Sequence, residues 1–245
     1  MNALLIFALA AAVFGTSTLS GIFGMAGGLV LLWILLLLLP VEAAIAVHGA
    51  IQVIANGARA VLAREHIAWK SLATIVCGLA LAALVLLAVD YQPNVLVVYF
   101  VIGLMPALVW IPKHWLGLDA AKPHHALLCG FLSGGLNLTV GVSGPTTDVF
   151  FIRTEMDRRA VIATKAATQV VSHAAKVVFY AGAVASFDAA EWMAIAIAAP
   201  FAVAGTRLGA AILHRMSNLQ FRFWTRWIVT AIGLVYLVQG ILLVV

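Results

Sequence analysis

The sequence Gly21-Ile22-Phe23-Gly24-Met25-Ala26-Gly27-Gly28 divides the apolar stretch 3–39 into two shorter runs. The runs, Leu4 to Phe14 and Leu29 to Leu39, have eleven residues each. At about 1.5 Å per residue, each run would cover only half of the hydrocarbon core of a bilayer. We therefore expect a broken helix, or a re-entrant hairpin that enters and leaves the membrane on one side.

The composition of the 245-residue chain excludes a soluble globular protein. Hydrophobic residues make up 64% of the chain and charged residues 9%, whereas a soluble domain has about 25% charged residues. So few charged side chains cannot cover a globule, which leaves lipid as the solvent for most of the surface. We expect an all-α, multi-pass protein of the cell (inner) membrane.

Charge and cysteine content narrow the range of partners. The formal net charge of +5 is attributed to basic cytoplasmic loops that face anionic lipid, and not to nucleic-acid binding. Cys77 and Cys129 lie in separate apolar stretches, and no spacing typical of a metal site is found. The predicted partners are the lipid bilayer and a small molecule, with no cofactor and no metal.

A second broken stretch, 124–152, contains Ser133-Gly134-Gly135 and Gly141-Val142-Ser143-Gly144-Pro145. Both glycine clusters predict interruptions of the same kind as the first. The remaining apolar stretches are long enough to cross a bilayer, which takes about 20 residues. There are six of them: 41–63, 69–89, 94–112, 160–184, 191–213 and 226–245.

Lysine and arginine are concentrated in alternate connections between these stretches. The positive-inside rule places the basic connections in the cytoplasm and the others outside. All connections alternate correctly if each broken stretch returns to its starting side, which predicts that both termini lie outside. The basic connections are 64–70, 113–122, 153–159 and 215–226, and those around 42, 90 and 188–191 contain no lysine or arginine.

The two broken stretches begin similar halves of the chain. Residues 1–120 and 121–245 each contain a broken stretch followed by three crossings, an odd number, so we expect two inverted repeats. With an offset of 117 residues, glycines and polar residues of the two halves coincide. The coinciding pairs are Gly24/Gly141, Gly27/Gly144, His48/Lys165, Ala50/Ala167, Gln52/Gln169, Asn56/His173 and Arg59/Lys176.

Polar residues recur along one face of a helix in each half. The spacing i, i+4, i+8 and i+11 places four side chains within about 80° of one face. Such a face is costly in lipid unless it borders water or another polar face. The members are His48, Gln52, Asn56 and Arg59 in the first half, and Lys165, Gln169, His173 and Lys176 in the second.

Two interpretations of these polar faces remain open. In the first, the amides of Gln52 and Gln169 join neighbouring helices, and Arg59 extends to the cytoplasmic surface. In the second, the faces bind a substrate. The cations have few acids between them, which favours an anionic substrate.

The glycine breaks also favour an anion. A helix that restarts within the membrane exposes unpaired N–H groups and the positive end of its dipole. The alternative is that these glycines only allow close helix packing. The predicted substrate-binding residues are Gly24, Gly27, Gly28, His48, Gln52, Gly141, Ser143, Gly144, Lys165, Gln169, His173 and Lys176.

Asp148 is the one acid that the hairpin topology buries deeply. It can cap the half-helix that follows Pro145, pair with Lys165, or carry a coupled proton. Of the three roles, the ion pair is the preferred interpretation.

At these residues the chain resembles the TauE/SafE sulfite exporter family, also described as the toluene sulfonate uptake permease family. The resemblance extends over nearly the whole length and involves the glycine patterns at 21–28, 130–145 and 205–209 and the alanine-rich helix 163–176. It implies a transporter that exports or takes up sulfite, an organosulfonate or a similar small sulfur-containing anion.

Two alternatives have other mechanisms. Gly141-Val142-Ser143-Gly144 also matches the G-x-S-G pattern of rhomboid intramembrane proteases, in which a serine meets a general base such as His173. Inverted repeats serve no purpose in a protease, so we expect no enzyme.

The second alternative, a passive anion channel, would use the same binding residues as a transporter. The sequence does not specify the anion, the direction of transport, the coupling ion or the oligomeric state.

Overall fold

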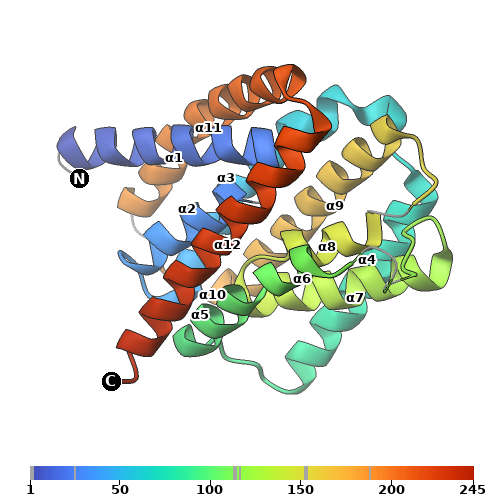
Figure 1. Cartoon of the computed structure of the whole chain (residues 1–245). Coiled ribbons are helices and arrows are strands. Elements are labelled where there is room, and N and C mark those ends of the chain that lie inside the picture. Colours follow the sequence, from blue (N-terminus) through green and yellow to red (C-terminus); the bar gives the residue numbers. More distant parts are fainter. Residues whose placement is uncertain (1–2, 25, 113–114, 116, 152–153, 188) are drawn as a thin grey trace.

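The computed structural model describes the chain except residues 1–2, 25, 113–114, 116, 152–153 and 188. Every regular element of the described residues is a helix (Figure 1), as the all-α class predicts. Residues 113–114, 152–153 and 188, which belong to connections used above for the topology, lie outside the described residues. The elements are α1 (Ala3–Phe23), α2 (Ala26–Leu36), α3 (Val41–Leu62), η1 (Arg64–His66), α4 (Trp69–Ala88), α5 (Val95–Leu104), α6 (Pro106–Trp110), α7 (Pro123–Val140), α8 (Gly144–Phe151), α9 (Arg158–Phe179), α10 (Ala181–Ala185), α11 (Ala189–Arg215) and α12 (Asn218–Leu242).

Within the described residues, four helices are long and apolar enough to cross a membrane. They correspond to four of the six predicted crossings, although the last begins well before the predicted residue 226. The four segments are Val41–Leu62, Trp69–Ala88, Trp192–Arg215 and Leu219–Leu242.

The other two predicted crossings differ from expectation. The stretch 94–112 forms two helices, α5 and α6, because Pro106 lacks the N–H that would continue the first one. The stretch 160–184 contains most of α9 and the short α10, and α9 runs from Arg158 to Phe179 with four lysines and arginines. Length and composition alone therefore do not identify α9 as a membrane-spanning helix.

Glycine breaks are present in both halves of the chain, at Gly24 and Gly141. Their φ angles are 79° and 85°, in the left-handed region that residues with a β-carbon rarely adopt. Each glycine caps the end of a helix: Gly24 N–H donates to Ser20 O at 2.8 Å, and Gly141 N–H donates to Asn137 O at 3.1 Å. The chain resumes a helix shortly afterwards, as α2 and as α8.

Two details of the predicted breaks are wrong. Helix α1 continues through residues 15–21 and has 21 residues, a length of about 31 Å, so it is not limited to half of a bilayer. The cluster Ser133-Gly134-Gly135 does not interrupt α7, which is continuous from Pro123 to Val140. Gly134 has a packing role against α4, as in the alternative interpretation of the glycine clusters.

Two glycines of α7, Gly130 and Gly134, lie where no side chain fits. A β-carbon at Gly130 would collide with the carbonyl oxygen of Ile75 on α4, and one at Gly134 would collide with Leu79. Helices α1 and α11 approach one another in the same way, since a β-carbon at Gly21 would collide with the backbone of α11. Small residues thus allow close backbone contact, which is a main source of helix association in lipid.

The helices pair between the two halves of the chain. Helix α1 packs on α11, α4 on α7, α3 on α9 and α5 on α12. In Figure 1, α1 (blue) and α11 (orange) lie together at one edge of the molecule, and α4 and α7 lie together at another. Helices α3 and α9 are central, because they contact each other and also α11 and α4, respectively.

The contact between α4 and α7 can be tested at Gly130. We expect Gly130→Ala to lower the free energy of unfolding by about 1–3 kcal/mol, the usual cost of overpacking, because the new β-carbon must displace the α4 backbone. Gly135→Ala on the same helix is the control, since its β-carbon would meet only Ala82 at 3.7 Å. Denaturant unfolding of the purified variants measures the difference, and equal stability would contradict the packing assignment.

Candidate functional site

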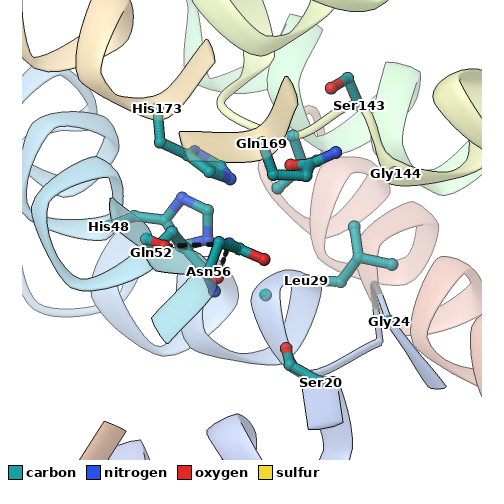
Figure 2. Close-up of a pocket in the computed structure, with 12 residues that line it drawn as sticks. Ser20, Gly24, Leu29, His48, Gln52, Asn56, Ser143, Gly144, Gln169 and His173 are labelled. Carbon is teal, nitrogen blue, oxygen red and sulfur yellow. Dashed lines mark hydrogen bonds between the residues drawn. The ribbon is translucent and has the colours of Figure 1, made fainter. Parts of the chain in front are cut away.

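A cavity of about 30 Å³ lies where the two glycine breaks meet the central helices α3 and α9 (Figure 2). This volume accommodates one or two water molecules or a very small solute. None of the lining residues is acidic. They are Ser20, Gly24, Gly28, Leu29, His48, Gln52, Asn56, Val142, Ser143, Gly144, Gln169 and His173.

The cavity unites predicted residues that are far apart in the sequence. Both breaks and both polar faces contribute to its wall. From the predicted set it contains Gly24, Gly28, His48, Gln52, Ser143, Gly144, Gln169 and His173.

Four lining residues were not among the predicted site residues. Asn56 belongs to the predicted polar face, and its place at i+8 was a usable signal. Ser20 lies one helical turn before Gly24, and its carbonyl oxygen accepts the hydrogen bond that ends α1. Leu29 and Val142 are apolar residues of apolar stretches, and no sequence signal separates them from other such residues.

A chain of hydrogen bonds connects the polar residues of α3. The Asn56 amide donates to the Gln52 carbonyl oxygen at 2.9 Å and to Gln52 Oε1 at 3.1 Å. Arg59 Nη2 donates to Asn56 Oδ1 at 3.0 Å. Figure 2 shows Gln52 and Asn56 beside His48 on one wall of the cavity. This chain fixes the Gln52 side chain next to Gly28, where a β-carbon would lie 3.0 Å from Gln52 Nε2.

Lys176 joins α9 to α3 and to the end of α7. Its side chain is fully buried, with 0% exposure. Lys176 Nζ lies 2.8 Å from His48 Nδ1 and donates to the carbonyl oxygen of Gly141 at 2.7 Å. Lys176 and Gly141 do not line the cavity, so both are adjacent to it and not part of its wall.

Two histidine rings meet at the cavity. His48 and His173 are arranged edge to face, with ring centroids 5.5 Å apart. His48 Nε2 and His173 Nδ1 are buried and have no hydrogen-bond partner among the described residues. Each ring therefore has one buried nitrogen whose hydrogen-bonding capacity no side chain of the described residues satisfies.

Lys165 lies away from the cavity and forms a salt bridge with Asp148. The two side chains are 30% and 33% exposed, so the expected deep burial of Asp148 is wrong. Of the three roles considered for Asp148, this geometry corresponds to the ion pair. The charge of Lys165 is already balanced by a neighbour.

Gly27 packs against α1 and does not line the cavity. A β-carbon there would collide with the carbonyl oxygen of Thr16 and with Ser20. Close packing, the alternative interpretation of the glycine breaks, therefore applies to this residue.

The described residues do not place Ser143 and His173 in hydrogen-bond contact. Both residues line the cavity. A nucleophilic serine needs a base within about 2.6–3.2 Å.

Comparison with protein families gives a match over most of the chain. The family described as Sulfite exporter TauE/SafE matches residues 8–236. No curated protein and no solved structure matches the chain. The match covers the two glycine breaks, the polar faces of α3 and α9 and every residue of the cavity, and the chain therefore belongs to the TauE/SafE sulfite exporter family.

Proposed function

We propose that the protein is a membrane transporter of small sulfur-containing anions and that it binds the anion in the cavity between α2, α3, α8 and α9. The observation that carries the proposal is the meeting of two helix restarts with uncharged hydrogen-bonding groups in one cavity without an acidic residue. Family membership supports the choice of a sulfur-containing anion.

The restarts supply hydrogen-bond donors for an anion. The first N–H groups of α2 and α8 have no partner within their own helices, and the helix dipoles place partial positive charge there. Gly28 near the start of α2 and Gly144 at the start of α8 both line the cavity. The side-chain amides of Gln52 on α3 and Gln169 on α9 add N–H donors.

The size of the cavity favours a compact anion. A volume of about 30 Å³ provides little more room than two water molecules need. Sulfite has one sulfur and three oxygen atoms, whereas an organosulfonate also carries a carbon chain, for which the cavity would have to widen. Sulfite is therefore the first substrate to test.

Two observations support inverted repeats over residues 1–120 and 121–245. The positive-φ glycines, Gly24 and Gly141, are related by the same offset of 117 that aligns the polar residues. If α1 corresponds to α7 and α11 to α4, the packing of α1 on α11 has its counterpart in the packing of α7 on α4. The pairs α3 with α9 and α5 with α12 each join two corresponding helices. Inverted repeats allow a central site to open to either side in turn.

The transport proposal can be tested in proteoliposomes with sulfite. We expect saturable uptake and counterflow for the wild type, and an at least tenfold lower rate for Gly28→Leu, because the side chain would fill the cavity beside Gln52. Gly57→Leu is the control, since a β-carbon at Gly57 has nothing within 4 Å. Non-saturating flux without counterflow would indicate a channel, and a normal rate in Gly28→Leu would place the substrate elsewhere.

The proposed topology places both termini on the outer, non-cytoplasmic side of the cell membrane. In a background without Cys77 and Cys129, we expect cysteines at Gln92 and Ser186 to react with an impermeant thiol reagent in intact cells, and one at Arg64 not to react. All three positions are exposed. Gln92 is preferred to Asp90, because Asp90 has a φ of 46°, which a cysteine would adopt only with strain. If only the cysteine at position 64 were labelled, the protein would have the opposite orientation to the one proposed.

A further inference from the structure

Lys176 does not line the cavity, and among the described residues its hydrogen-bond contact with a lining residue is with His48. We propose that Lys176 is a positioning residue of the anion site, which orients His48 so that its Nε2–H points toward the anion and which supplies the positive charge that the anion balances. This inference rests on the proposed function.

The charge of Lys176 determines the direction of its hydrogen bond with His48, whose Nδ1 atom lies 2.8 Å from Lys176 Nζ. As an ammonium, the state that the proposal assigns to it, Lys176 has three donors and no acceptor, so His48 Nδ1 is the acceptor. In a neutral imidazole the other nitrogen then carries the hydrogen. His48 Nε2 is therefore a donor, which attracts an anion, whereas the opposite tautomer would present a lone pair.

The position of His48 Nε2 suits this role. The atom is buried and has no hydrogen-bond partner among the described residues. A β-carbon at Gly28, near the start of α2, would lie 3.5 Å from it. The Nε2–H group thus lies beside the restart of a helix, where N–H groups of the backbone also favour an anion.

The charge of Lys176 is not balanced by the part of the protein that the structure describes. Lys165 on the same helix has Asp148 as its partner, whereas Lys176 forms no salt bridge with a described residue. Its contacts are His48 Nδ1 and the carbonyl oxygen of Gly141, and neither is an anion. A fully buried ammonium without a counter-charge is costly, and an anion in the adjacent cavity would lower that cost.

A purely structural role for Lys176 makes a different prediction. The residue connects α9, α3 and the break at Gly141, so its removal is expected to reduce stability in either case. Only the positioning role requires a change in anion affinity of the folded protein and a defined tautomer of His48.

The affinity test uses sodium sulfite titrated calorimetrically into the purified full-length protein. We expect Lys176→Gln and His48→Gln each to weaken binding about 10- to 100-fold, the range for loss of a charge-assisted hydrogen bond. The double variant should have the same affinity as whichever single variant binds sulfite more weakly, because Lys176 acts through its hydrogen bond to His48. The control is Lys70→Gln, which removes the same charge from an exposed position on α4. Thermal unfolding without sulfite establishes that each variant is folded.

A second measurement needs no variant at Lys176. In the wild type labelled with ¹⁵N-histidine, and with signals assigned by their loss in His48→Gln, we expect His48 to be protonated at Nε2 and unprotonated at Nδ1. The opposite tautomer overturns the inference even if Lys176→Gln does not fold. Sulfite affinity that is unchanged in folded Lys176→Gln also overturns it and leaves the proposed function intact. Failure of the folded wild type to bind sulfite overturns both.

Discussion

The structure depends on two points at which a helix ends inside an apolar protein. At Gly24 and Gly141 the backbone turns into the left-handed region, and the N–H groups of the following helices lose their usual partners. In a bilayer such groups must be enclosed by protein or face a polar cavity. Residues of α3, of α9 and of both breaks line one cavity.

The outer helices make this arrangement possible by coming very close. Gly130 and Gly134 of α7 lie against α4, and Gly21 of α1 lies against α11, so each break is attached to a helix of the other half of the chain. Dispersion contacts over these glycine surfaces stabilise the pairs where no hydrophobic effect acts between lipid-exposed helices. The tyrosine hydroxyls of α12 and α9–α10 add buried hydrogen bonds: Tyr236 donates to Leu29 O and Tyr180 to Leu138 O, both at 2.7 Å.

The sequence predicts the helical class, the two breaks and most of the cavity wall, because polar residues and glycine clusters are rare signals in an apolar chain. It does not distinguish a glycine that breaks a helix from one that allows packing. Gly134 lies inside α7 against α4, whereas Gly141 ends the same helix with a positive φ, and a neighbour from α4 is not visible in sequence. The offset of 117 aligns His48 with Lys165, but α3 and α9 run in opposite directions, so His48 instead meets Lys176. Residues that the offset makes equivalent therefore need not be neighbours.

The polarity of α9 has a consequence for the synthesis of the protein. Lys165 and Lys176 both lie within this helix, and a lysine at the centre of an inserting helix costs about 2.5–3.5 kcal/mol. Helix α9 by itself is therefore poorly suited to move from the translocon into the lipid. Helix α3 is made earlier and presents His48 to Lys176, while Asp148 on α8 is made just before α9 and pairs with Lys165. If α9 enters the membrane, we therefore expect its insertion to depend on segments that precede it, with the first half of the protein supplying part of the polar surface that α9 contacts.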